Sequence, residues 1–165
     1  MPTSLCHHVA VQVADLDRAT EFYVTALDAR VLTRRQRVDG HVAASVMGGA
    51  TGTAFDMCRL GFESGCLELF QFTGEIRPNW AGEDRLRPRV PHFGVHVDDV
   101  EAALRRVEAA GAQRLWPEPE QWGSAKTMYV EDLDGNVFEL CDASLPDLVG
   151  LLVALDPTLE PEVAA

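Results

Sequence analysis

The stretch His8-Val-Ala-Val-Gln-Val-Ala-Asp-Leu-Asp-Arg-Ala19 decides the fold, because the chain repeats it later as His92-Phe-Gly-Val-His-Val-Asp-Asp-Val-Glu-Ala-Ala103. At a constant offset of 84 residues, the two stretches share their first histidine and the aspartate at their eighth position. Further along, Cys66-Leu-Glu-Leu-Phe70 matches Val137-Phe-Glu-Leu-Cys141 at an offset of 71. Chance similarity of two amphipathic units would explain the apolar spacing but not the matched histidine and glutamate. The sequence therefore predicts two copies of one structural unit.

Each copy begins with the pattern of a strand followed by a helix. Valines at every second position of residues 8–14 predict a half-buried strand. Apolar residues spaced three and four apart from Leu16 to Leu27 predict an amphipathic helix. In the second copy, Asp98 with Glu101 indicates a capping box at the helix start, and Gly111 suits the left-handed residue that ends a helix. Further strands are expected at 29–38, 41–47, 54–60 and 65–72, and at 112–116, 125–131 and 136–142.

These elements predict an α+β fold of two βαβββ modules in tandem. The first module covers 1–73, a linker covers 74–90, the second module covers 91–143, and a short helix and tail cover 144–165. We expect the two modules to form one domain, because 165 residues is an ordinary length for a single core.

The composition excludes several classes of partner. Fourteen Lys and Arg against 26 Asp and Glu give a net charge of −12, so nucleic acids and anionic membranes are unsuitable partners. No apolar run is long enough to span a bilayer, and the first residues lack the pattern of a secretory signal. The four cysteines form no CxxC pair and are interpreted as reduced thiols. We expect a soluble cytoplasmic protein that acts on a small molecule.

Four polar residues lie on the strand faces turned away from the helices. His8, Glu68, His92 and Glu139 each have apolar neighbours that point to the helix-covered side. If the modules pair around an axis, two histidine nitrogens and two glutamate oxygens surround one point. Such a set suits a divalent ion such as zinc, nickel, cobalt or iron. A single strand histidine is more often a hydrogen-bonded surface residue, but here histidine and glutamate occur twice at matching places.

The remaining histidines and the cysteines have other expected roles. His96 lies on the same face as His92 but about 13 Å along the strand, too far to share an ion. We expect His96 and its counterpart Gln12 to orient a substrate, or His96 to shuttle a proton. His7 is interpreted as a surface or packing residue and His41 as a turn residue without a chemical role. Three cysteines lie two residues from a proposed ligand: Cys6, Cys66 and Cys141. They could form a thiolate site, but a role as small apolar residues in a cavity wall is favoured.

The segments from His8 to Tyr23, from Pro91 to Asp99 and from Asp132 to Leu140 together resemble the vicinal oxygen chelate superfamily, which contains glyoxalase, bleomycin-resistance and dioxygenase proteins. The resemblance covers about residues 5–143. It implies curled mixed sheets around a metal cavity, with one ligand from the first and last strand of each module: His8, Glu68, His92 and Glu139. Asp28 and Leu133 depart from the family pattern, where glycine and proline are usual.

The resemblance leaves three functions open. The first is an isomerase, epimerase or lyase that chelates a small carbonyl or vicinal-oxygen compound and transfers a proton, with Glu68 or Glu139 as the base. The second is a ring-cleaving or other metal-dependent dioxygenase, and the third is a protein that sequesters a small molecule. We expect one divalent ion per site, with zinc, nickel, cobalt, manganese, magnesium or iron all compatible. A homodimer is also expected, since modules of this superfamily pair within or across chains and Leu148–Leu155 offers an apolar surface.

Overall fold

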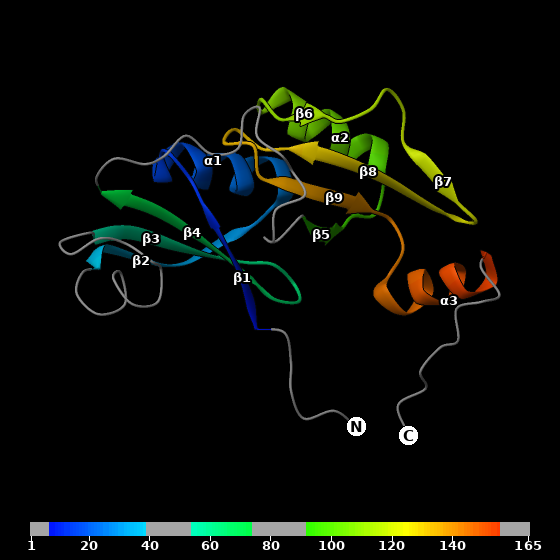
Figure 1. Cartoon of the computed structure of the whole chain (residues 1–165), viewed down its shortest axis with the longest axis horizontal. Coiled ribbons are helices and arrows are strands. Elements are labelled where there is room, and N and C mark those ends of the chain that lie inside the picture. Colours follow the sequence, from blue (N-terminus) through cyan, green and yellow to red (C-terminus); the bar gives the residue numbers. More distant parts are fainter. Residues whose placement is uncertain (1–6, 39–53, 74–91, 156–165) are drawn as a thin grey trace, which may run out of the picture. The chain divides into compact units, whose positions relative to one another are not determined.

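The structure is a computed structural model that describes residues 7–38, 54–73 and 92–155. The chain divides into two compact units (Figure 1). In its described part, the N-terminal unit contains residues 7–38, 54–73 and Leu133–Asn136, and the C-terminal unit contains residues 92–132 and 137–155. The predicted strand at 41–47, the linker at 74–90 and the tail beyond 155 lie outside the described residues, as do Cys6 and His41.

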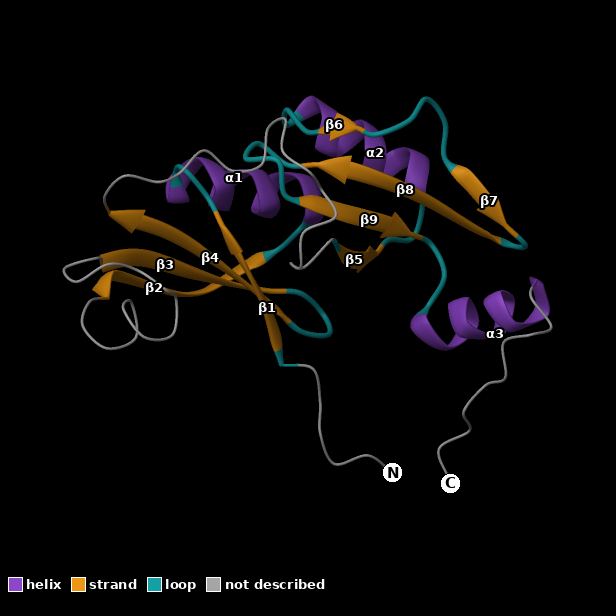
Figure 2. Ribbon diagram, viewed as in Figure 1, coloured by secondary structure: helices purple, strands orange, loops and turns teal. Residues whose placement is uncertain are grey.

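The N-terminal unit is a four-stranded mixed sheet with one helix against it (Figure 2). The strands lie in the order β1-β4-β3-β2, in which β1 runs parallel to β4 and the other neighbours are antiparallel. The helix contacts the sheet through buried side chains that include Phe22 and Tyr23. The elements are β1 (His8–Gln12), α1 (Leu16–Leu27), β2 (Arg30–Val38), β3 (Ala54–Gly61) and β4 (Cys66–Thr73).

The C-terminal unit repeats this arrangement. Its sheet has the order β5-β9-β8-β6, again with the first pair parallel, and the short strand β7 pairs with β8. The α+β class is confirmed, with two separate mixed sheets, and β7 is an addition that the sequence did not predict. The elements are β5 (Phe93–His96), α2 (Val100–Ala109), β6 (Gln113–Arg114), β7 (Glu120–Trp122), β8 (Ala125–Glu131), β9 (Val137–Cys141) and α3 (Leu145–Leu155).

The repeat extends to the helix caps and corrects one prediction. The Asp15 carboxylate accepts a hydrogen bond from the Arg18 amide, and the Asp99 carboxylate accepts one from the Ala102 amide. Asp99 therefore caps α2, and the expected cap at Asp98 is wrong. Asp15 and Asp99 are matched by the 84-residue offset, so the repeat itself identifies the cap better than the local capping-box pattern does.

The sheet face that carries Glu68 also carries a packed apolar cluster. Alternation along β4 places Leu67 and Leu69 on the helix side and Glu68 and Phe70 on the other side. There Phe70 packs with buried Val38, Phe55 and Met57 and with partly buried Phe72. The face opposite the helix is thus apolar beyond Glu68, whereas the sequence alone predicted only its polar residues.

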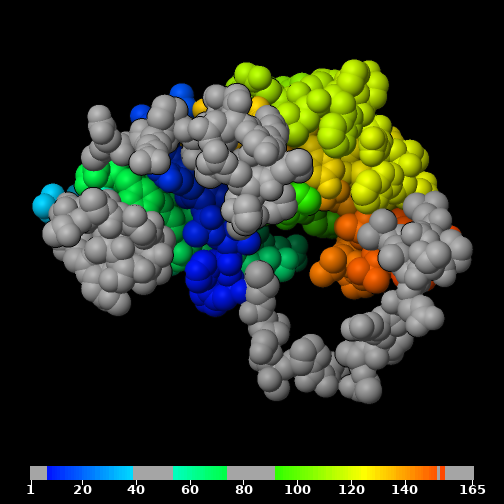
Figure 3. Space-filling view, in the orientation of Figure 1, coloured from blue at the N-terminus to red at the C-terminus, as the bar shows by residue number. Residues whose placement is uncertain are grey.

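The last described helix, α3, exposes apolar side chains. Leu145 is 74% exposed and Val149, one turn later, is 45% exposed. The helix is drawn in orange and red in Figure 3. Among the described residues, no helix combines the length and the apolar character needed to cross a membrane. The homodimer expected from this apolar segment stays a prediction.

Candidate metal centre

His8 and Glu68 come together in the N-terminal unit. His8 is the first residue of β1, and the parallel register pairs Ala10 of β1 with Glu68 of β4. The His8 Nε2 atom lies 3.5 Å from Glu68 Oε2. The other ring nitrogen, Nδ1, lies 2.8 Å from Nδ1 of His7. When His8 Nδ1 is the donor in this contact, Nε2 of the neutral imidazole is left free to accept a hydrogen bond or to bind a metal.

The Glu68 carboxylate has a second partner, Arg59. The antiparallel register of β3 and β4 places Arg59 directly opposite Glu68, and its Nε donates a hydrogen bond to Oε1. The Glu68 side chain is only 7% exposed, so burial of its charge requires such partners. One carboxylate oxygen therefore faces a guanidinium and the other faces His8.

His92 and Glu139 come together in the C-terminal unit in the same way. His92 directly precedes β5, and Glu139 lies on the parallel neighbour β9. His92 Nε2 is 3.6 Å from Glu139 Oε2. The Thr127 hydroxyl, which is fully buried, donates a 2.6 Å hydrogen bond to Glu139 Oε1. The Glu139 carboxylate therefore accepts a hydrogen bond from a neutral hydroxyl, whereas the Glu68 carboxylate accepts one from the Arg59 cation.

An aromatic wall stands beside the second pair. Tyr129 lies directly opposite Glu139 in the β8–β9 register. Its ring contacts the His92 ring edge-on, with 4.9 Å between centroids, and the Trp116 ring at 5.1 Å. Burial and the neighbouring Glu139 carboxylate raise the pKa of Tyr129 to about 12, so the phenol stays protonated at neutral pH.

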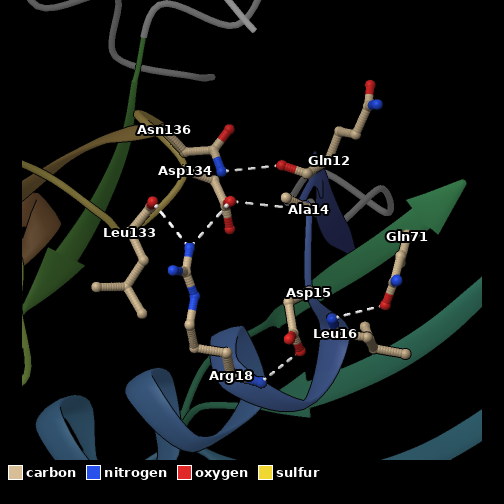
Figure 4. Close-up of polar contacts among 9 residues, drawn as sticks. All are labelled: Gln12, Ala14, Asp15, Leu16, Arg18, Gln71, Leu133, Asp134 and Asn136. Carbon is tan, nitrogen blue, oxygen red and sulfur yellow. Dashed lines mark hydrogen bonds and ion pairs between the residues drawn. The ribbon is translucent and has the colours of Figure 1, made fainter. Parts of the chain in front are cut away.

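A polar network fixes the end of β1, the strand that carries His8 (Figure 4). The Leu133–Asn136 segment of the N-terminal unit supplies most of it. Asp134 Oδ1 accepts from the Ala14 amide at 3.2 Å and from the Arg18 guanidinium at 3.3 Å. The Asn136 side chain donates to the Gln12 carbonyl at 3.0 Å. The strand is therefore anchored four residues from His8, which limits the positions its imidazole can take.

In each pair, the distance between the histidine Nε2 and the glutamate Oε2 suits a cation bound to both atoms. Two ligands at about 2.1 Å from a tetrahedral zinc ion lie about 3.4 Å apart, close to the separations found here. The observed 3.5 and 3.6 Å separations exceed a good N–H···O hydrogen bond. Imidazole nitrogen with carboxylate oxygen is also a donor set that zinc, nickel, cobalt and iron accept. Each pair fits a divalent ion, although no three His, Cys, Asp or Glu side chains converge among the described residues.

The two expected substrate residues lie on the predicted faces. His96 ends β5 and is exposed, and the register places it across from Cys141, on the same side of the sheet as Glu139. Between His92 and His96 stands Gly94, where an added Cβ would meet nothing within 4 Å. Gln12 ends β1, and its amide points away from the network in Figure 4. The roles of His96 and Gln12 stay predictions.

The described cysteines do not favour a thiolate ligand. Cys66 and Cys141 are free, and each lies two residues from a glutamate of a pair. Burial, together with the nearby Glu68, raises the pKa of Cys66, and burial also raises the pKa of Cys141. The thiolate is the form that binds metals, so these raised pKa values disfavour a thiolate in the metal-free chain, and the expected role of both cysteines as wall residues stays a prediction.

Arg59, Thr127 and Tyr129 are site residues that the sequence analysis missed. No local sequence pattern identifies Arg59 or Tyr129, because each lies opposite its glutamate only through the antiparallel register. The loops span residues 62–65 and 132–136, so counting from two-residue turns at Ser64-Gly65 and Asp134-Gly135 would place Gly61 and Val130 opposite the glutamates instead.

The family model of the Glyoxalase/Bleomycin resistance protein/Dioxygenase superfamily matches residues 5–140. The chain belongs to this superfamily. The resemblance seen in the two repeated stretches is thereby confirmed, and the matched residues include both histidine–glutamate pairs.

Curated relatives of this superfamily member carry lyase and epimerase names. A probable chloroplastic lactoylglutathione lyase of Arabidopsis thaliana is 28% identical over 138 residues, which cover 82% of this chain and 35% of the relative. A 2-epi-5-epi-valiolone epimerase of Actinomyces is 29% identical, with coverage of 69% and 63%. The chain thus spans only about a third to two thirds of these two relatives. A glyoxalase family protein of Bacillus cereus shares the fold with a TM-score of 0.66 at 19% identity, covering 86% of this chain and 95% of that one.

Proposed function

We propose that this chain is a metal-dependent enzyme of the lyase or isomerase type. Its substrate is a small carbonyl compound with two neighbouring oxygens, and the reaction moves a proton on the carbon beside the carbonyl. The single observation that carries this proposal is the duplicated pair, in which a histidine nitrogen and a buried glutamate oxygen stand 3.5 Å apart in one unit and 3.6 Å apart in the other. The relatives named as a lyase and as an epimerase support the same reaction type.

In this proposal His8, Glu68, His92 and Glu139 hold the ion. A divalent ion held by these residues would supply a Lewis acid that polarises a substrate carbonyl oxygen and offsets negative charge beside it. Hydrogen bonds to Oε1 of each glutamate, from Arg59 and from Thr127, hold the carboxylates in fixed rotamers. A carboxylate held in this way accepts a proton from the substrate carbon without first having to reorient.

The two glutamates are the candidates for this base. Glu68 already shares its charge with the Arg59 guanidinium, whereas Glu139 accepts a hydrogen bond from the neutral Thr127 hydroxyl. His96, on the same side of the sheet as Glu139, is proposed to orient the substrate or pass the proton onward. The protonated phenol of Tyr129 stands beside Glu139 as a further hydrogen-bond donor.

The experiment has two stages. Protein purified without chelators is analysed for metals by mass spectrometry, and we expect one divalent ion per chain. The metal-loaded protein is then incubated with hydroxyacetone in D2O, and exchange of its carbon-bound protons is followed by NMR. Exchange that depends on the metal is the expected result.

The other functions predict different results in the same samples. Iron in the protein, with oxygen uptake when catechol is added, would support a dioxygenase and overturn proton transfer. Protein without metal would overturn the proposal and favour a sequestering protein. Glu139→Gln is the matched variant for the exchange reaction, since it keeps the shape of the side chain and removes its basicity.

A further inference from the structure

Arg59 has unused hydrogen-bonding capacity beside the first pair. A guanidinium carries five N–H donors, and the hydrogen bond to Glu68 uses the one on Nε. Among the described residues, Glu68 is the only ion-pair partner of Arg59. The Arg59 side chain is 43% exposed, so part of it is open to solvent at the edge of the pair. A solute that binds there would approach Glu68 and His8 from the solvent side.

A second arginine extends this positive region along the sheet. The β2–β3 register pairs Thr33 with Arg59 and Arg35 with Met57, and Met57 and Arg59 share one side of β3. Arg35 and Arg59 are therefore diagonal neighbours on the side that carries Glu68. Thr33 and Arg35 are both exposed. Arg34, between them, points to the other side and pairs with Asp17 of α1.

Charge balance indicates what this region would bind. His8, Glu68 and Arg59 together are neutral when the histidine is unprotonated. A divalent ion added to this set leaves an excess of positive charge, in a chain whose overall charge is −12. A positive site in a negative protein attracts small anions while the rest of the surface repels them. Arginine is also the side chain best shaped to bind a carboxylate or phosphate through two parallel hydrogen bonds.

We propose that Arg59 binds an anionic group of the substrate, so that the substrate is a chelating carbonyl compound with a separate carboxylate or phosphate. This inference rests on the proposed function and narrows its substrate class. Arg59 pairs with Glu68 in the absence of substrate and turns its terminal amino groups to the anion when substrate binds. Arg35 adds positive charge one strand further out. Arg59 is thus a specificity-determining residue.

The test uses two hydroxamic acids as probes, because they chelate metals through two neighbouring oxygens. Acetohydroxamic acid has no further charge, and succinic acid monohydroxamide carries an additional carboxylate. Their dissociation constants for the zinc-loaded protein are measured by calorimetry. We expect the carboxylate-bearing probe to bind at least tenfold more tightly. A third probe is a hydroxamic acid of the same chain length that carries a phosphate ester in place of the additional carboxylate. Its dissociation constant reports whether the site prefers a phosphate or a carboxylate.

Three variants locate the source of that preference. Arg59→Gln is expected to abolish this preference, measured as the ratio of the two dissociation constants, whereas Arg59→Lys keeps part of it. Arg34→Gln is the matched control, since it removes an arginine from the other side of the same sheet, and its preference should equal that of the wild type. Circular dichroism and metal content establish that each variant is folded and loaded.

The possible failures are distinct. A wild-type protein that binds both probes equally, or an Arg59→Gln protein that keeps the full preference, overturns the role of Arg59 and leaves the proposed function intact. A wild-type protein that binds neither metal nor acetohydroxamic acid overturns the proposed function and this inference with it. Loss of the preference in Arg34→Gln as well would show a general charge effect and would also overturn the role of Arg59.

Discussion

The two units place a glutamate at the same position of the same kind of sheet but surround it differently. Glu68 and Glu139 both lie on the strand parallel to the first strand, and each faces a histidine nitrogen through Oε2. Directly across the antiparallel pair stands Arg59 in one unit and Tyr129 in the other. The repeat is therefore kept in the candidate ligands and lost in the residues next to them. That difference allows two equivalent carboxylates to perform different tasks.

The largest expected effect tests whether the pairs act as ligands at all. His92→Ala removes one imidazole nitrogen and should abolish stoichiometric metal binding in a protein that stays folded, because His92 lies at the start of a strand and outside the apolar core. Metal content is measured after dialysis, with circular dichroism as the control for folding. His8→Ala should give the same result, and full metal retention by either variant would contradict a role for that unit.

Substitution of the residues that contact the two glutamates is predicted to change metal affinity in opposite directions. Thr127→Val removes the hydroxyl that holds Glu139 and should weaken metal binding about 10- to 100-fold, as is usual when a partner of a ligand is lost. Arg59→Gln removes a cation and should strengthen metal binding by about fivefold, since charges a few ångström apart in a solvated site interact by ~1 kcal/mol. Competition with a fluorescent zinc chelator measures both. Changes of the same sign would show that the difference between the units has no effect on the metal.

Tyr129 predicts that the free energy of unfolding decreases at alkaline pH. The matching residue of the N-terminal unit, Arg59, predicts no such decrease. In the metal-free protein, burial and Glu139 raise the pKa of Tyr129 from 10.0 to about 12. The unfolded chain then loses this proton near pH 10 while the folded chain keeps it, so the stabilisation is complete below pH 10 and is lost as the pH rises to 12. Tyr129→Phe should remove this loss.

Two measurements report on this group. The absorbance of tyrosinate, compared between wild type and Tyr129→Phe, gives the pKa directly, and urea midpoints at pH 9 and pH 11 give the loss of stability. Added zinc should lower the pKa, because a cation on Glu139 favours the phenolate. A tyrosinate transition near pH 10 for Tyr129 would contradict the structure.

His96 and Gln12 extend the comparison to the substrate. They are matched by the 84-residue offset, yet only the histidine can carry a proton. His96→Ala should lower turnover at least tenfold with unchanged metal content, equivalent to about 1.4 kcal/mol of transition-state stabilisation. Gln12→Ala should raise KM and leave kcat nearly unchanged. A smaller loss for His96→Ala than for Gln12→Ala would reverse their proposed roles.

The sequence predicted what the repeat encodes and missed what depends on register. The offsets of 84 and 71 predicted two similar modules and matched the two histidines and the two glutamates, because matched strands occupy matched places. That each histidine faces the glutamate of its own unit depends on the parallel strand registers, and the expected single four-residue metal site stays a prediction. The offsets could not predict β7, since Glu120–Trp122 is too short to show alternation. Thr127 was missed because a buried threonine looks like an ordinary strand residue until the carboxylate it contacts is known.

The smallest expected effect compares the ends of the two helices. Asp28 ends α1 in the left-handed conformation, with φ 55° and ψ 25°, whereas the positive φ after α2 belongs to Gly111, at 104°. The left-handed conformation costs an L-residue about 1–2 kcal/mol, and less for aspartate, so a glycine at this position would remove that cost. The same glycine would also lower the free energy of unfolding by about 0.5–1 kcal/mol, because the unfolded chain becomes more flexible. Asp28→Gly should therefore stabilise the protein by only about 0.5 kcal/mol. Asp28→Ala, which keeps the strain and loses the tolerant side chain, should destabilise it. Urea midpoints measure both variants, and a stabilising Asp28→Ala would show that this helix end is not strained.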